Sequence, residues 1–194
     1  MAQTIYLIRH ARTEWNEQKR LQGRGDSPLL QSSYYDVLKM NSWIKNIKFD
    51  SFFYSPLPRV VNTLNQLKDL VAKRISHNDL LSEMDFGKYE GYESFSFEVL
   101  NFKLKRDKWT TPWPNGESYS NVNDRVNQFL DYIRGFETIG ILAHETINKL
   151  FLYNVMGFSR EKIYKIKQPN NVVFKISVDF DPMNYTRNLE EIVI

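Results

Sequence analysis

Two kinds of apolar pattern alternate along this chain. Short, nearly continuous apolar runs are typical of strands that are buried on both faces of a sheet. They cover residues 4–8, 51–54, 75–81, 138–143 and 171–178. The stretches between them carry apolar residues at helical spacing and predict helices over residues 32–47, 59–71, 122–133 and 147–155. Strands that alternate with helices favour an α/β fold, a three-layer sandwich in which a mostly parallel central sheet has helices on both faces.

Three of the predicted strands are followed by side chains that can bind or attack an anion. Arg9 and His10 follow the first strand. Arg59 comes shortly after the second strand, and His144 follows the strand over residues 138–143. In a mostly parallel sheet these carboxyl ends lie at one edge, which is where ligands bind. Because two of the three histidines in the chain occupy such ends, the pattern predicts a catalytic site for a phosphate-like anion.

The composition narrows the class of protein. The chain has 194 residues, of which 42% are hydrophobic, and this suffices for one domain over residues 1–194 with its own core. A net charge of +3 does not indicate a nucleic-acid partner. The chain has no cysteine, which excludes a thiolate nucleophile and a cysteine metal site. The first apolar run ends at Arg9 and is too short for a signal peptide or a membrane span. We therefore expect a cytoplasmic protein without a membrane partner, and the sequence does not indicate its oligomeric state.

The segment over residues 94–113 departs from the alternation. It combines aromatic with basic side chains, namely Phe95, Phe97, Phe102, Trp109, Trp113, Lys103, Lys105, Arg106 and Lys108. Its place between the third predicted strand and the next helix suits an insertion that caps the mouth of the site. The alternative is an ordinary amphipathic helix with a solvated lysine face.

Several short motifs occur in an order that resembles a known family. They are Arg9-His10-Ala11-Arg12-Thr13, Leu21-Gln22-Gly23, Ser55-Pro56-Leu57 with Arg59, Leu81 and Glu83 before Phe86-Gly87, Gly116-Glu117-Ser118, Ala143-His144, and Pro169-Asn170-Asn171. Matched in this order over residues 5–174, the chain resembles the histidine phosphatase superfamily, which includes the cofactor-dependent phosphoglycerate mutases. The resemblance implies the phosphoglycerate mutase-like form of the fold predicted above.

The resemblance also implies how the strand-end residues act. Arg9 and Arg59 would hold a phosphate monoester dianion, and Asn16 would add a neutral donor. His10 would be the nucleophile, which attacks phosphorus to form a phosphohistidine while a backbone carbonyl holds its other ring nitrogen. His144 would face the transferring group and stabilise its charge. No cofactor and no metal are implied, because the arginines and histidines supply the positive charge.

The leaving alkoxide needs a proton, which a carboxylic acid near the pocket would supply. Glu83, just beyond the third predicted strand, matches the position of this acid in the family. Asp85 and Glu90 are near enough in the sequence to be alternatives.

Two residues depart from the pattern of the family. Ala11 stands where a glycine usually follows the Arg-His pair, and its methyl group could crowd a tight turn. Glu145 stands where a glycine usually follows the second histidine. If Glu145 points inward, it would repel a dianion and raise the pKa of the neighbouring histidine. A non-catalytic relative that binds phosphate or has a regulatory role therefore stays an alternative.

Two segments of the sequence bear on the choice between a phosphatase and a mutase. The loop over residues 22–26 is more similar to the phosphatases, and the only candidates for a clamp on a mutase substrate's carboxylate are the basic residues of the 94–113 segment. The sequence predicts a metal-independent phosphomonoesterase that acts on a small phosphorylated metabolite. Phosphoglycerate mutase-type phosphoryl transfer is the alternative.

Overall fold

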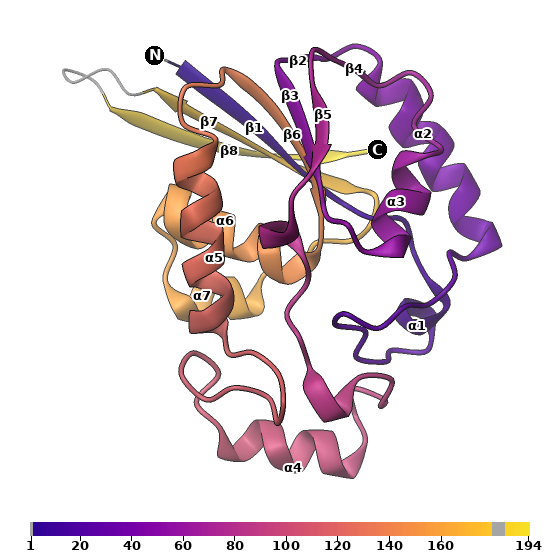
Figure 1. Cartoon of the computed structure of the whole chain (residues 1–194), viewed down its shortest axis with the longest axis vertical. Helices are drawn as coiled ribbons and strands as arrows, with labels where there is room; N and C mark the ends of the chain where they lie inside the picture. The colour runs from indigo at the N-terminus through magenta and orange to yellow at the C-terminus, as the bar shows by residue number, and fades with distance from the viewer. Residues whose placement is uncertain (1, 180–184) are drawn as a thin grey trace.

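A computed structural model describes residues 2–179 and 185–194 of the protein. A six-stranded sheet forms its centre. The strand order is β5-β3-β6-β1-β7-β8 (Figure 1). The strands are β1 (Ala2–Arg9), β3 (Ser51–Tyr54), β5 (Ile75–His77), β6 (Thr138–Ala143), β7 (Val172–Asp179) and β8 (Thr186–Val193). The first four run parallel to one another, β7 runs antiparallel to β1, and β8 runs antiparallel to β7 and ends the sheet on that side. Two short strands, β2 (Lys48–Phe49) and β4 (Val71–Ala72), pair apart from this sheet.

Helices cover both faces of the sheet. They are α1 (Glu14–Glu17), α2 (Tyr34–Ile44), α3 (Pro58–Leu64), α4 (Phe97–Lys105), α5 (Tyr119–Tyr132), α6 (Glu145–Met156) and α7 (Arg160–Lys165). Successive residues of a strand point to opposite faces. Leu7 and Ile141 pack with α5 and α6 in one core layer. Ile8 and Leu142 pack with α2 and α3 in the other. Both faces are therefore apolar, which explains the continuous apolar runs, and the predicted three-layer α/β fold is confirmed.

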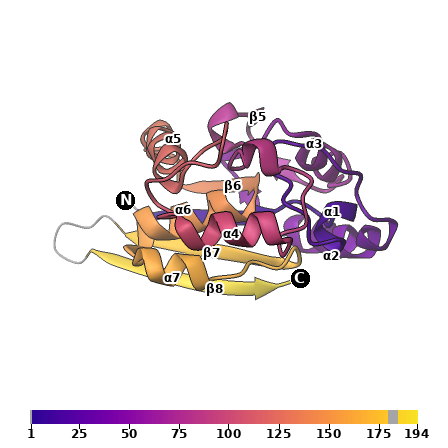
Figure 2. The same cartoon turned by 90° about the horizontal axis from the view of Figure 1, so that it is seen from below.

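The carboxyl ends of three strands meet at one edge of the sheet. Arg9 at the end of β1 pairs with Ala143 at the end of β6, and Tyr54 at the end of β3 pairs with Leu142. The residues that follow these strands therefore lie close together. Figure 1 shows α4 beyond this end of the sheet, and Figure 2, seen from below, shows it in front of the strands.

The third predicted strand is shorter than expected. It ends at His77 rather than at residue 81, and a 3-10 helix spans Asp79–Leu81. The Asn78 side chain accepts a hydrogen bond from the backbone N–H of Leu80 at 3.0 Å and so begins this helical turn.

The predicted helix over residues 59–71 is wrong in its second half. Helix α3 ends at Leu64, and Val71 pairs with Lys48 as part of β4. Asn41 of α2 exchanges two hydrogen bonds with Asp69, at 2.7 and 2.9 Å, which draw this stretch toward α2. Leu67 is nevertheless buried, as its place in the apolar stripe suggested.

Some basic residues of the 94–113 segment line the main pocket and others do not. Lys105 is exposed at the end of α4 beside the exposed Leu104, whereas Lys103 and Lys108 line the main pocket. A plain solvated lysine face therefore does not describe this segment, and its role as a cap stays a prediction. No helix in the described residues, α4 included, is long and apolar enough to cross a membrane.

Candidate active site

His10 follows β1 and is held by hydrogen bonds at both ring nitrogens. Its Nδ1 lies 2.7 Å from the carbonyl oxygen of Ala11, which can only accept, so Nδ1 carries the proton. Its Nε2 accepts from the Nε of Arg59 at 3.3 Å. Burial lowers the pKa of His10 well below its usual value, and the charges of Arg59 and Arg9 lower it further. The imidazole is therefore neutral at physiological pH, with a lone pair on Nε2 that can attack an electrophile.

Arg59 is fixed by the loop that follows α1. Its Nη1 donates to the carbonyl of Gly25 at 3.0 Å, and its Nη2 donates to that of Gly23 at 2.7 Å. Burial lowers the pKa of Arg59 to about 10, so the guanidinium stays charged at neutral pH. Gly23 has a φ of +54°, and a Cβ there would lie 2.0 Å from the Oε1 of Glu90. Only glycine fits this place without a shift of its neighbours, which explains the glycine of the Gln22-Gly23 motif.

His144 is fully buried next to these two residues. Its ring centre lies 5.3 Å from that of His10. Its Nδ1 accepts from the Nη2 of Arg59 at 3.1 Å, so its Nε2 carries the proton and donates to the Oγ of Ser55 at 2.8 Å. Burial and the charge of Arg59 lower its pKa well below the usual value. His144 is not among the described residues that line the pocket, and its direct contact with a transferring phosphoryl group stays a prediction.

Glu145 points toward the pocket and pairs with Arg9. Its Oε2 lies 2.9 Å from the Nη1 of Arg9, and its Oε1 lies 2.6 Å from the Nζ of Lys149. Burial alone would raise the pKa of Glu145, but Arg9 and Lys149 outweigh burial and lower it. An inward Glu145 was expected to raise the pKa of its neighbour His144, and this expectation is wrong. Burial and Arg59 dominate at His144, and two cations already pair with the carboxylate.

Ala11 does not crowd the turn after β1. Among the described residues only Lys19 and Asn115 have a positive φ outside glycine, so the backbone at Ala11 needs no glycine. Its methyl group is buried in the apolar layer under α2 and α3. Its N–H donates to the Oγ1 of Thr63 at 3.0 Å, and its carbonyl orients His10.

These side chains open into a pocket of about 400 Å³. Arg9, His10, Asn16, Arg59 and Glu83 all line it, so the structure brings these five predicted site residues together. The Oδ1 of Asn16 accepts from the backbone N–H of Thr13 at 3.2 Å, which leaves its amide nitrogen as the group that a ligand can meet.

Gln22 also lines the pocket, although we did not predict it as a site residue. Its Oε1 accepts from the Oγ1 of Thr13 at 3.1 Å. Its Nε2 is buried and has no hydrogen-bond partner in the part of the chain that the structure describes. A buried amide donor without an acceptor is costly, so this nitrogen is a further candidate donor to phosphate. Its signal in the sequence was the Gln22-Gly23 motif itself.

Glu83 is the only one of the three candidate acids that lines the pocket within the described residues. Its Oε1 accepts from the N–H of Met84 at 2.8 Å, and its Oε2 accepts from the N–H of Thr146 at 3.4 Å. Asp85 instead accepts from the N–H of Gly87 at 2.7 Å. Glu90 accepts from the backbone N–H groups of residues 24 and 25, both at 2.8 Å. Asp85 and Glu90 thus stabilise loops.

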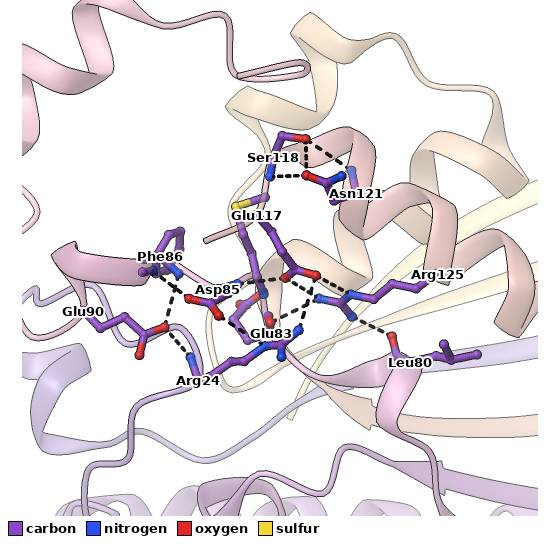
Figure 3. A network of polar contacts seen from close by, with 12 residues as sticks. Arg24, Leu80, Glu83, Asp85, Phe86, Glu90, Glu117, Ser118, Asn121 and Arg125 are labelled. Atoms are coloured by element: carbon purple, nitrogen blue, oxygen red, sulfur yellow. Dashed lines mark hydrogen bonds and ion pairs between the residues drawn. The ribbon is translucent and has the colours of Figure 1, made fainter. Parts of the chain in front are cut away.

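Arg125 of α5 holds the loop that carries Glu83 (Figure 3). Its guanidinium donates to the carbonyl of Leu80 at 2.7 Å and to that of Glu83 at 3.1 Å. Its Nε and Nη2 also donate to the two carboxylate oxygens of Glu117, both at 3.1 Å. Glu117 in turn accepts from the N–H of Asp85 at 2.9 Å. These contacts were not predicted from the sequence, because the carbonyl of Leu80 that Arg125 binds lies 45 residues away.

The model of the histidine phosphatase superfamily (branch 1) matches residues 5–187 of the chain. The protein therefore belongs to the histidine phosphatase superfamily, as the order of its motifs implied.

Individual relatives agree with this assignment. A protein of Hydrogenobacter thermophilus named for phosphoserine phosphatase activity is 27% identical over 183 residues, which are 90% of this chain and 89% of that protein. GpmB of Escherichia coli, named for phosphoglycerate mutase activity, is 28% identical over 67% of this chain and 62% of its own length. A crystal structure from Escherichia coli named for alpha-ribazole-5'-P phosphatase activity has a TM-score of 0.84 at 20% identity, covering 100% of this chain and 97% of that one. Together with the family, the phosphatase-named relatives support phosphatase activity in general.

Proposed function

We propose that this protein is a metal-independent phosphomonoesterase that hydrolyses a small phosphorylated metabolite through a phosphohistidine on His10. The observation that carries the proposal is the state of His10. It is a neutral imidazole whose Nδ1 is tied to the Ala11 carbonyl and whose Nε2 faces the buried Arg59 guanidinium. Such a nitrogen is a nucleophile with a positive charge beside the place where the phosphoryl oxygens would lie.

The first chemical step transfers the phosphoryl group to His10. The Nε2 lone pair attacks phosphorus while the bond from phosphorus to the ester oxygen breaks, and Arg9 and Arg59 stabilise the charge on the equatorial oxygens. Glu83 gives a proton to the departing alkoxide, which leaves as an alcohol. His144 keeps Arg59 in place through its Nδ1.

The second step hydrolyses the phosphohistidine. The Glu83 carboxylate takes a proton from a water molecule, whose oxygen attacks phosphorus as the bond from nitrogen to phosphorus breaks. Inorganic phosphate leaves, Nε2 regains its lone pair and Glu83 regains its proton. In the mutase alternative, a second substrate hydroxyl takes the place of this water.

Hydrolysis of p-nitrophenyl phosphate in excess chelator tests the proposal. We expect activity to persist, and we expect orthovanadate to inhibit it because vanadate adopts the five-coordinate geometry of the transferring group. Isomerisation of phosphoglycerate much faster than phosphate release would favour the mutase instead. Complete loss of activity on chelation would contradict the metal-independent mechanism, and binding of phosphate without any turnover would indicate a non-catalytic relative.

A further inference from the structure

Strand β8 forms a long edge of the central sheet. It spans eight residues and pairs with β7 on one side, and no other described strand pairs with it. Figure 2 shows β8 at the outer margin of the molecule. The opposite edge strand, β5, has only three residues. An edge strand presents a row of unpaired N–H and C=O groups, which can pair with a strand of another chain.

The register of β7 with β8 shows which backbone groups face the free edge. The pairing is continuous over eight residue pairs and reaches Val172 and Val193. One step further, the N–H of Ile194 donates to the carbonyl of Asn171 at 2.9 Å. Residues of an antiparallel ladder alternate between pairs that exchange hydrogen bonds and pairs that do not. The even-numbered residues of β8 therefore bond to β7, and the backbone groups of the odd-numbered residues face the free edge. These odd-numbered residues are Arg187, Leu189, Glu191 and Val193.

The side chains of the odd-numbered residues share one face of the sheet, with a basic and an acidic group at equal distances from Leu189. Arg187 stands two residues before Leu189 and Glu191 two residues after it, and both charged residues are exposed. Leu189 is half-buried against the core layer that α5 and α6 cover. On the other face, Glu190 already pairs with Lys175 of β7 at 3.0 Å. Glu191, by contrast, makes no ion pair with any described residue.

We propose that β8 pairs with β8 of a second copy of this chain, antiparallel and about a two-fold axis at Leu189. Leu189 then lies opposite its own equivalent, and Arg187 of each copy lies opposite Glu191 of the other. Two pairs of unlike charges, a pair of leucines and the outward backbone groups of the odd-numbered residues join the strands. The two six-stranded sheets form one continuous sheet.

Charged side chains on an edge strand often serve instead to keep other chains away. Their order along β8 distinguishes the two roles. A two-fold axis at Arg187 or at Glu191 would place like charges directly opposite each other, which is destabilising. Arg187 lies opposite Glu191 only when the axis is at Leu189. The charges of β8 therefore select one register for a second copy rather than oppose every register.

The proposed pairing is independent of the chemistry at His10. No residue of β8 is among the described residues that line the pocket. Strand β8 runs parallel to β1, which carries Arg9 and His10 at its carboxyl end. Because the two copies of β8 are antiparallel, the two pockets lie at opposite ends of the joined strands. Failure of the proposed function would leave the dimer in place, and the reverse also holds.

Sedimentation equilibrium from micromolar to millimolar protein tests the pairing. We expect the mass of the wild type to approach twice that of one chain as the concentration rises. Arg187→Glu and Glu191→Arg should each raise the dissociation constant about tenfold or more, because each places two pairs of like charges in the dimer. The double variant restores unlike pairs in the reverse order, so its constant should lie within about threefold of the wild type. Arg134→Glu, the same charge change at an exposed position just after α5, is the control and should have no effect.

A second comparison tests the backbone contacts. Glu191→Pro should weaken association more than Glu191→Gln, because proline also removes an N–H that faces the free edge and leaves the bonds to β7 intact. Circular dichroism checks that each variant is folded.

A wild type that stays monomeric at millimolar concentration would overturn the inference. So would equal effects of the proline and glutamine variants, which would exclude strand pairing. A dimer that is insensitive to both charge reversals, or that the double variant does not restore, would use another surface, such as the exposed Phe97 and Leu104 of α4.

Discussion

The reactivity of His10 depends on its neighbours Ala11 and Arg59, which do not react themselves. The Ala11 carbonyl fixes the proton on Nδ1. Burial lowers the pKa of His10, and the charge of Arg59 lowers it further, so the ring stays neutral. Arg59 can be buried because the Gly23 and Gly25 carbonyls and His144 accept its hydrogen bonds. The nucleophile and the charge that assists it are thus positioned together before substrate binds.

Glu83→Gln tests the proton donor. The change keeps the size of the side chain but removes its acidic proton. Release of the alcohol from alkyl phosphates should slow by about 10²- to 10⁴-fold. Release of nitrophenolate from p-nitrophenyl phosphate should change little, since nitrophenolate leaves without a proton. Single-turnover rates of leaving-group release check this, because they report the first step apart from hydrolysis of the phosphohistidine, in which Glu83 also acts. Equal losses on the two substrates would move the role of the acid to a water molecule or another acid.

Glu145→Gln tests whether this carboxylate competes with phosphate for Arg9. Removal of the charge breaks the 2.9 Å ion pair with the guanidinium of Arg9 and also the ion pair with Lys149. The inhibition constant of inorganic phosphate should fall about three- to tenfold, whereas Glu161→Gln, at an exposed position on α7, should leave it unchanged. Weaker phosphate binding in Glu145→Gln would show instead that Glu145 is needed to orient Arg9.

Among single residues, those at strand ends could be predicted and those held by remote contacts could not. Arg9, His10 and His144 follow apolar strands directly, so the sheet alone brings them together. Arg125 acts through backbone carbonyls of a distant loop, and no local pattern marks such a contact. The direction of Glu145 was likewise open, because it depends on Lys149 one helical turn later and on Arg9 from another strand.

At the scale of elements, the buried strands were the most predictable part of the chain. The strands over Ser51–Tyr54 and Thr138–Ala143 have the expected bounds, because apolar layers on both faces force a continuous apolar run. The final strand β8 (Thr186–Val193) was not predicted, since its edge position leaves most of its residues exposed and its sequence polar. The predicted helix was longer than α3 because Leu67 and Val71 continue its apolar stripe. Leu67 is buried beyond the end of the helix, and Val71 belongs to β4.

Arg125→Ala tests the role of α5 in placing the Glu83 loop. The variant leaves the carbonyls of Leu80 and Glu83 without their donor, which should cost about 1–3 kcal/mol of stability. Because the loop carries the acid, single-turnover release of the leaving group from alkyl phosphates should slow about tenfold more than release from p-nitrophenyl phosphate. Arg134→Ala, which removes only an exposed pair with Asp131, is the matched control and should change neither. Equal losses on both substrates would mean that Arg125 supports the fold without placing Glu83.

At the scale of the whole molecule, the pocket is lined by Arg9 and His10 at the carboxyl edge of the sheet and by Lys103 of α4. Figure 1 shows α4 beyond this edge. The sequence predicted the sheet edge, but it could not show that Lys167, just after α7, lines the same pocket as Lys103 from α4. That juxtaposition depends on how α4 and α7 lie relative to the strands, which no periodicity encodes. The set of cations that line the pocket is therefore a property of the folded chain. The capping role of the 94–113 segment stays a prediction.

The central claim is that His10 carries the phosphoryl group during turnover, and a rapid-quench experiment with p-nitrophenyl phosphate tests it most directly. A good leaving group makes the first step fast, so nitrophenolate should appear in a burst of about one equivalent per active site if hydrolysis of the phosphohistidine is slower. Mass spectrometry of the quenched enzyme should place an acid-labile, base-stable phosphoryl group on His10. His10→Ala should show neither the burst, the label nor turnover, while its circular dichroism spectrum matches that of the wild type. Wild-type turnover without a phosphoryl group on His10, together with persistent hydrolysis by His10→Ala, would contradict the mechanism.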